Sequence, residues 1–121
     1  MLIHFKKLIC CRVQLLTSPT EDIGKILASL ARIEIGGTSD FSTGIQVAQL
    51  ALKHRKNKNG GQRIIIFVGS PLQDNIENIQ KLGKQLKKNN IAIDIVNIGE
   101  CDENSEILNE LLKSANSSDN R

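Results

Sequence analysis

Apolar residues at helical spacing alternate along this chain with short apolar runs that are typical of strands. The strand-like runs lie at 13–16, 64–68 and 91–98. The helical stripes lie at 23–30, 41–55, 76–88 and from about residue 104 onward. The predicted order is therefore strand, helix, helix, strand, helix, strand, helix. Strands that alternate with helices in this way indicate the α/β class, with a parallel sheet and helices on its faces.

Polar residues mark where several of these helices are expected to begin. Residues 18–21 read Ser-Pro-Thr-Glu, which is the pattern of a capping box with Ser18 as the N-cap. The next helix is expected to start near residues 41–42, and Asp74 or Asn75 can cap the third. The sequence thus predicts both the type and the approximate start of these helices.

Two segments are apolar enough to predict extensive burial. The run at 64–68 shows no polar alternation, as expected for a parallel strand that is covered on both faces. The helix at 41–55 has an unusually wide stripe, so we expect it to be buried on more than one face. That stripe consists of Ile45, Val47, Ala48, Leu50, Ala51 and Leu52.

Composition narrows the possible roles. The 121 residues suffice for one domain, and the 2% of aromatic residues argue against binding of single-stranded nucleic acid by stacking. The net charge of +3 is mild, and the lysine clusters are interpreted as solvated helix ends. The three cysteines have no zinc-binding spacing, and an odd number of cysteines without a pattern suits a reducing compartment. No segment has the length and apolar content of a membrane span or a signal peptide, so a soluble intracellular chain without nucleic-acid or membrane partners is expected.

Candidate catalytic groups do not form a recognisable pattern. The glycines at 36–37 follow a helix instead of a strand and do not match a phosphate-binding loop. His54 lies in a basic helix end, and Ser70 lacks the flanking glycines of a nucleophile elbow. We therefore expect a protein that is not an enzyme and has no cofactor.

Several segments resemble one family, the von Willebrand factor A-type domain of the ubiquitin-receptor subunit of the proteasome regulatory particle. They are residues 43–55, 63–71, 86–100 and 115–119, in that order. The resemblance implies a von Willebrand factor A-like (Rossmann-like) fold, with a mostly parallel sheet, helices on both faces and without the usual first strands. It divides the chain into an atypical segment at 1–12, a partial A-like domain at 13–115 and a polar tail at 116–121.

The resemblance also implies a function. It suggests a non-enzymatic scaffold module of the 26S proteasome regulatory particle in ubiquitin-dependent protein degradation, in the cytoplasm and nucleus, with lid and base subunits as partners. Ubiquitin is not expected to bind this chain directly, because Leu50-Ala51-Leu52 resembles a ubiquitin-binding core but lacks the acidic run and is assigned to a buried stripe. The alternative is a divalent-metal-dependent adhesion or chaperone-like A domain outside the proteasome.

The metal-dependent alternative requires oxygen ligands that this sequence does not supply. In A-type domains an Asp-x-Ser-x-Ser motif, a threonine and a further aspartate hold magnesium, in keeping with its preference for oxygen. Thr38 and Ser39 stand near the second position, but Gly69-Ser70 replaces the final aspartate and the first motif is absent. The sequence therefore predicts no metal site.

The remaining candidate site is a rim for partner contacts. Ligand surfaces of open α/β sheets gather outside the carboxyl ends of the strands. The loops expected at that edge lie at 17–18, 37–42, 69–72 and 99–101. The residues predicted to bind a partner there are Thr38, Ser39, Asp40, Ser70, Pro71 and Leu72.

Overall fold

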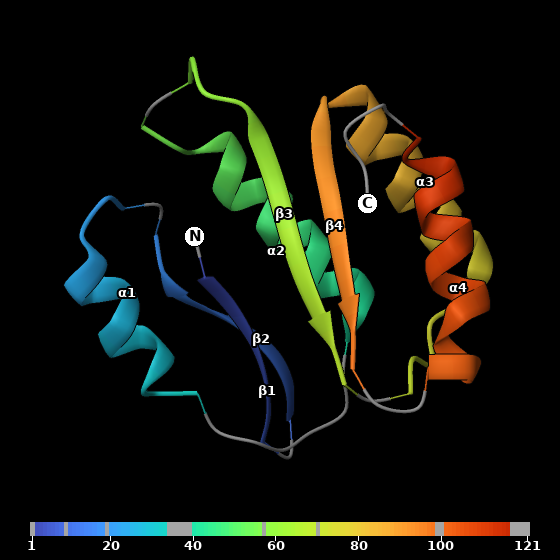
Figure 1. Ribbon diagram of the computed structural model, residues 1–121, viewed down its shortest axis with the longest axis horizontal. Coiled ribbons are helices and arrows are strands. Elements are labelled where there is room, and N and C mark those ends of the chain that lie inside the picture. The colour runs from blue at the N-terminus through green and yellow to red at the C-terminus, as the bar shows by residue number, and fades with distance from the viewer. Residues whose placement is uncertain are drawn as a thin grey trace. The chain divides into compact units, whose positions relative to one another are not determined.

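The computed structural model divides the chain into two compact units, Met1–Asn59 and Gly60–Arg121, which are described separately (Figure 1). The backbone is described at residues 2–8, 10–18, 20–33, 40–56, 58–69, 71–98 and 101–116. Two predicted regions lie partly outside the described residues. They are the loop before the second helix, at 36–40, and the polar tail, at 116–121.

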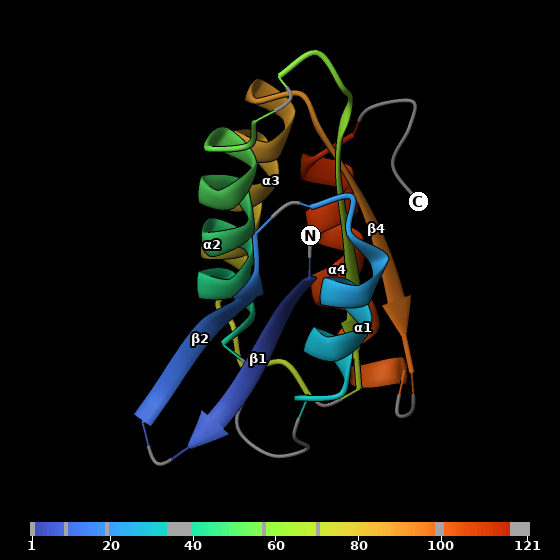
Figure 2. The ribbon, with the colours of Figure 1, turned by 90° about the vertical axis from the view of Figure 1, so that its left-hand side faces the viewer.

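The first unit is built on an antiparallel hairpin. Strand β1 (Leu2–Leu8) pairs with β2 (Cys10–Thr17), and Leu8 stands opposite Cys10 in the register (Figure 2). Helices α1 and α2 both contact this hairpin. The sequence predicted only the second half of β2, because residues 8–10 contain none of the glycine, asparagine, aspartate or proline that usually mark a hairpin turn.

Helix α1 (Ile23–Leu30) starts later than predicted. Its N-cap is Asp22, whose Oδ1 accepts a hydrogen bond from the Lys25 N–H at 3.3 Å. The capping box with Ser18 as N-cap was therefore wrong. The hydroxyl oxygen of Thr20 accepts a hydrogen bond from the Asp22 N–H at 3.2 Å. The segment for which the capping box was predicted therefore precedes the helix. The apolar stripe of α1 also lies open, since Ile23 and Leu27 are exposed while Ser29 is buried.

Helix α2 (Phe41–Lys53) begins where it was predicted, after the N-cap Asp40. Its buried side is a single stripe, formed by Phe41, Gly44, Ile45, Ala48 and Leu52. The expected burial on more than one face was wrong, because Leu50 is 56% exposed. Leu50 is thus not part of the buried stripe to which Leu50-Ala51-Leu52 was assigned.

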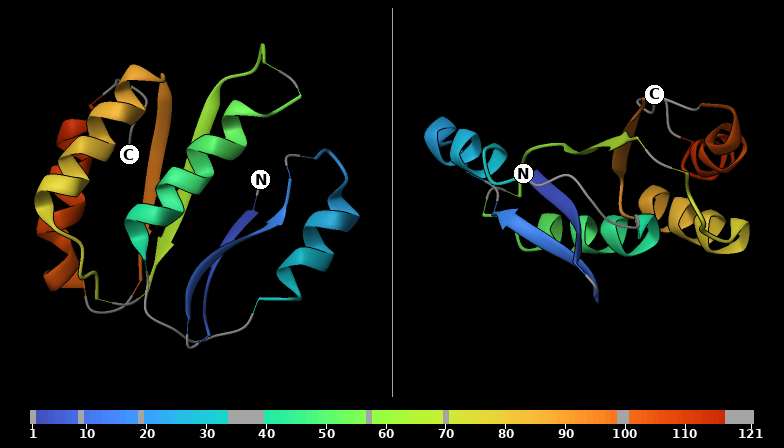
Figure 3. Two further views of the ribbon diagram at one scale, coloured as in Figure 1. Left: turned by 180° about the vertical axis from the view of Figure 1, so that it is seen from behind. Right: turned by 90° about the horizontal axis from the view of Figure 1, so that it is seen from below.

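The second unit is a strand–helix–strand–helix unit. Strands β3 (Gln62–Val68) and β4 (Ile91–Asn97) pair in parallel, and helices α3 (Ile76–Lys88) and α4 (Cys101–Ser114) follow them. The two helices pack against each other and both contact β4 (Figure 3). The buried apolar residues of this unit are Ile64, Ile66, Val68, Leu72, Ile79, Leu82, Leu86, Ile91, Ile93, Leu108, Leu111 and Ala115.

The ends of α3 and α4 combine confirmed and corrected predictions. Asn75 caps α3, as one of the two predicted candidates, by accepting the Glu77 N–H on its Oδ1 at 3.1 Å. After α3, Asn90 has a φ of 53°, a left-handed conformation that asparagine tolerates better than most residues. Helix α4 begins at Cys101, earlier than the predicted start near Asn104, so Asn104 lies inside the helix.

The expected cover on both faces of β3 is not present in the described residues. Burial alternates strictly along the strand, so Ile64, Ile66 and Val68 are buried while Ile65 and Phe67 are exposed. The strand predicted at 13–16 is part of β2 and pairs with β1, since the described strands form two separate pairs, antiparallel β1–β2 and parallel β3–β4. Among the described residues, no helix has the length and apolar character needed to cross a membrane.

Candidate partner-binding surfaces

The loop after β3 is held by the start of α4. The Leu72 N–H donates to Asn104 Oδ1 at 2.9 Å, and both residues are buried, at 9% and 1% exposure. The strand ends are joined as well, because the Ile98 N–H donates to the Val68 carbonyl oxygen at 2.7 Å. One hydrogen bond thus joins the loop after β3 to α4, another joins the ends of the two strands, and Pro71 is exposed.

The structure describes three of the six residues predicted to bind a partner. Asp40 lies in the first unit, and Pro71 and Leu72 lie in the second. Thr38, Ser39 and Ser70 lie outside the described residues. The carboxylate of Asp40 caps α2 by accepting the Thr43 N–H on Oδ1 at 3.0 Å, so part of its hydrogen-bonding capacity serves the fold.

Leu72 and Pro71 differ in what they can offer a partner. The side chain of Leu72 is packed in the core, and its backbone amide is bound to Asn104. Pro71 is exposed and has no amide hydrogen to donate, so it can contribute only apolar contact and its carbonyl oxygen. A partner at this edge therefore meets Pro71 and the neighbouring backbone before it meets Leu72.

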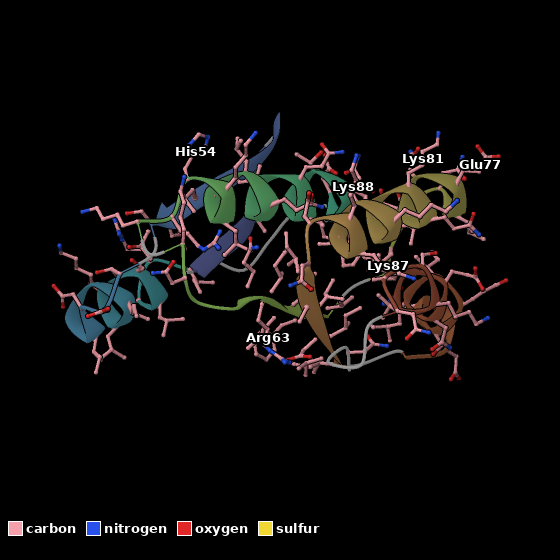
Figure 4. All side chains as sticks on the ribbon, turned by 90° about the horizontal axis from the view of Figure 1, so that it is seen from above. His54, Arg63, Glu77, Lys81, Lys87 and Lys88 are labelled. Carbon is pink, nitrogen blue, oxygen red and sulfur yellow. The ribbon has the colours of Figure 1, made fainter. Side chains whose placement is uncertain are left out.

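Sequence analysis missed a second surface, which we call the β3–β4 outer face. It consists of Arg63, Ile65 and Phe67 on β3 and of Asp94 and Val96 on β4. Arg63 Nη1 donates to Asp94 Oδ2 at 2.6 Å, and Figure 4 shows Arg63 on the side of β3 away from α3. An alternating pattern would have revealed this face, but a strand with isoleucine or valine at most positions shows none.

The basic residues lie where solvated helix ends were expected. Figure 4 shows Lys81, Lys87 and Lys88 along α3, and all three are exposed. Lys87 and Lys88 occupy the last turn of α3, where positive charge complements the helix dipole. His54 is the exposed C-cap of α2. Lys87 and Lys88 therefore stabilise the end of α3, and Lys81 adds exposed positive charge to the same helix.

One carboxylate joins α3 to α4. Glu110 Oε2 accepts from Gln80 Nε2 at 3.3 Å, and Glu110 Oε1 accepts from Lys113 Nζ at 2.9 Å. The hydrogen bond from Lys113, followed by that from Gln80, lowers the pKa of the Glu110 carboxyl below its usual value. This group strengthens the contact between the two helices and does not belong to either candidate surface.

The described residues form several surfaces that another macromolecule could contact. No group of three or more His, Cys, Asp or Glu side chains that could hold a metal ion occurs among these residues. The features that do gather are an exposed apolar face, a fixed loop after β3 and basic helix ends. Protein surfaces with such features can bind other macromolecules through the area that is buried and through complementary charge.

Comparison with known proteins places this geometry in a family context. Residues 1–71 match the family described as von Willebrand factor type A domain. The crystal structure described as that of the SpRpn10 VWA domain superposes with a TM-score of 0.79 and 47% sequence identity. The match covers 88% of this chain and 55% of that chain.

Curated relatives share much of this sequence. The 26S proteasome non-ATPase regulatory subunit 4 homolog of Oryza sativa is 50% identical over 108 residues, which is 88% of this chain and 27% of that protein. The 26S proteasome regulatory subunit rpn10 of Schizosaccharomyces pombe is 48% identical over 106 residues, which is 88% of this chain and 43% of that protein. The chain therefore spans less than half the length of these relatives.

Proposed function

Because this chain belongs to the von Willebrand factor type A domain family, we propose that it is a non-enzymatic protein-binding scaffold module of the 26S proteasome regulatory particle. In this role it serves ubiquitin-dependent protein degradation in the cytoplasm and nucleus. The observation that carries the proposal is the 50% identity, over 88% of this chain, with a protein named as a 26S proteasome subunit homolog. Identity at that level across most of a chain supports a shared binding role in addition to a shared fold.

The proposed partners are lid and base subunits of the regulatory particle. The proposed contact residues are those of the carboxyl-end rim, Thr38, Ser39, Asp40, Ser70, Pro71 and Leu72. Support for the part of this rim in the second unit comes from the hydrogen bond between the Leu72 amide and Asn104, since a segment that is already held loses less conformational entropy on binding. Ubiquitin is not proposed as a direct ligand of this chain.

The test is native affinity purification of the tagged chain from its own cells, followed by mass spectrometry. Stoichiometric lid and base subunits are expected to accompany the wild-type chain. A soluble chain recovered without them would contradict the proposal.

The rim is tested separately with variants that preserve the fold. Pro71→Arg adds bulk and charge at an exposed position and is expected to reduce recovery of the partners. Asp40→Asn removes the charge but keeps a side-chain oxygen that caps α2, so a loss of recovery would report on docking. Gln46→Arg is the matched control, because it adds the same charge at an exposed position on α2. Recovery unaffected by Pro71→Arg and Asp40→Asn would count against the rim.

The alternative function, a metal-dependent A domain outside the proteasome, has less support than the scaffold function. Relatives that are 45–50% identical to this chain are named as proteasome subunits, including those of Dictyostelium discoideum and Saccharomyces cerevisiae. Thermal unfolding in the presence of magnesium or manganese tests it directly. A rise of several degrees in the melting temperature would favour the metal-dependent A domain.

A further inference from the structure

We propose that Asn59 is a site of spontaneous deamidation, at which the backbone nitrogen of Gly60 attacks the side-chain amide of Asn59. The two residues form the one Asn-Gly pair in the sequence of 121 residues. The proposal does not depend on the scaffold function, because it concerns the chemistry of a single turn. It rests on the order of the two residues, on the exposure of the turn, on the open space at Gly60 and on the positive charge beside the turn.

The reaction requires only groups of this chain and water. The Gly60 amide loses its proton, and its nitrogen forms a bond to Cγ of Asn59. The bond from Cγ to Nδ2 breaks, so the Nδ2 group takes up a proton and leaves as ammonia, and a succinimide ring remains. Water then opens the ring at one of its two carbonyl carbons, which leaves either aspartate or isoaspartate at position 59.

The turn that carries this pair lies exposed between two points at which the chain is held. Ahead of the turn, Arg55 Nη2 donates to the Lys58 carbonyl oxygen at 3.1 Å. Beyond it, at the start of β3, Gln62 Nε2 donates to the Asn89 carbonyl oxygen at 3.3 Å. Residues 59–61 between these two points are all exposed. The reacting pair is therefore open to the water that the reaction consumes.

Gly60 provides the space that ring closure requires. Asparagine side chains reach neighbouring backbone groups easily, but here the Asn59 side chain must lie directly against the next amide nitrogen. A side chain on that next residue would crowd the ring, and glycine has none. Even a Cβ atom added at Gly60 would meet no atom within 4 Å. The surrounding structure thus places no steric obstacle around Gly60.

Positive charge close to the turn favours the first step. Deprotonation of the Gly60 amide creates an anionic nitrogen, and a nearby opposite charge favours the charged form of a group. Lys58 directly precedes Asn59, and the Arg55 guanidinium contacts the Lys58 carbonyl oxygen. Deamidation then replaces a neutral amide with a carboxylate, so the formal net charge of the chain falls by one unit from +3.

Another asparagine supplies an internal comparison. Asn104 is also followed by a small residue, Ser105, but it is 1% exposed inside α4. Its Oδ1 accepts the Leu72 N–H at 2.9 Å, and this buried bond fixes the side chain. No deamidation is therefore expected at Asn104 while the chain is folded.

The experiment follows the purified full-length chain during incubation at mildly alkaline pH. Peptide mapping by mass spectrometry is expected to show that the Asn59 peptide gains the mass difference between a carboxyl and an amide group. Isoelectric focusing is expected to show a more acidic form of the chain. The rate is expected to rise with pH, because the deprotonated nitrogen is the nucleophile. Methylation by an isoaspartyl-specific methyltransferase identifies the isoaspartate product.

The variants separate the role of Gly60 from a general effect on the turn. Gly60→Ala is expected to slow the reaction at least several-fold, because its Cβ crowds the ring. Asn59→Gln is expected to remove the reaction at this position, because glutamine would have to close a larger ring. Gly61→Ala is the matched control, since a Cβ there also meets no atom within 4 Å, and the rate is expected to stay unchanged. Circular dichroism establishes that each variant is folded.

Three results would overturn the proposal. The first is an unchanged Asn59 peptide in the folded chain over the period in which the chain unfolded in guanidinium chloride reacts. The second is equal slowing by Gly60→Ala and Gly61→Ala, and the third is deamidation at Asn104 as fast as at Asn59. Since the assay uses only the purified chain, its outcome is independent of whether the chain enters the proteasome.

Discussion

Gly83 allows helices α3 and α4 to cross closely, and replacing it with alanine should destabilise the second unit. A Cβ atom added to Gly83 would lie 2.4 Å from the Ser114 Cβ and 3.1 Å from both the Ala115 nitrogen and the Leu111 carbonyl oxygen. Non-bonded carbon atoms prefer a separation of about 3.5–4.0 Å, so the helices must move apart by about 1 Å. The contacted atoms include backbone, which a change of side-chain rotamer cannot relieve.

The expected magnitude is a balance of two effects. Alanine in place of glycine inside a helix contributes about 1 kcal/mol of intrinsic stability. Overpacking costs about 1–3 kcal/mol, and the upper end applies here because the backbone of α4 is involved. We therefore expect Gly83→Ala to lower the free energy of unfolding by about 2 kcal/mol. For a chain of this size the melting temperature should fall by about 8 °C.

The assay is urea unfolding followed by circular dichroism, with thermal unfolding as a second readout. Gly61→Ala is the control, because a Cβ at Gly61 meets no atom within 4 Å. Adding Ser114→Gly to Gly83→Ala removes the 2.4 Å contact and should recover part of the lost stability. The reasoning is refuted if Gly83→Ala is as stable as the wild-type chain, or if Ser114→Gly recovers nothing.

Three further predictions concern single polar groups. Asn104→Ala should lower the free energy of unfolding by about 1–3 kcal/mol, because the buried Leu72 N–H then loses its acceptor, and thermal unfolding would measure the loss. Asp22→Ala should destabilise α1 by about 1 kcal/mol whereas Ser18→Ala should not, and hydrogen exchange of the first turn of α1 would distinguish them. The folded-state pKa of Glu110 is lowered, so its stabilisation is present above the usual carboxyl pKa and is lost as the pH falls through the folded-state value. Glu110→Gln should accordingly reduce the loss of stability on acidification, as measured by melting temperature between about pH 6 and pH 3.

The sequence predicted helix positions best where a cap and a stripe agree. Asp40 and Asn75 stand directly before strong apolar stripes, and α2 and α3 start after them. For α1 the sequence pattern pointed to Ser18 as the N-cap, and that prediction was wrong. The structure uses Asp22, because the chain ahead of it turns with Thr20 bonded to the Asp22 amide.

The exposed face of β3 and the loop after it could not be predicted for different physical reasons. An uninterrupted run such as Ile64–Phe67 has no period, so it does not show which side chains are covered. The hydrogen bond between the Leu72 amide and Asn104 joins residues 32 positions apart, and it depends on the parallel crossover that brings the start of α4 next to the loop after β3. Sequence reasoning located the loop but not the residue that holds it.

The Arg63–Asp94 pair has a consequence for how β3 and β4 find their alignment. A slip of two residues along β3 would keep isoleucine-sized side chains on the same faces, so hydrophobic patterning alone tolerates the wrong alignment. Polar contacts help to distinguish the native alignment, among them Arg63 with Asp94 and the Gln62 Nε2 donor with the Asn89 carbonyl oxygen. A slipped pairing would separate both contacts. These polar contacts therefore favour one strand register among several that have nearly the same apolar contacts.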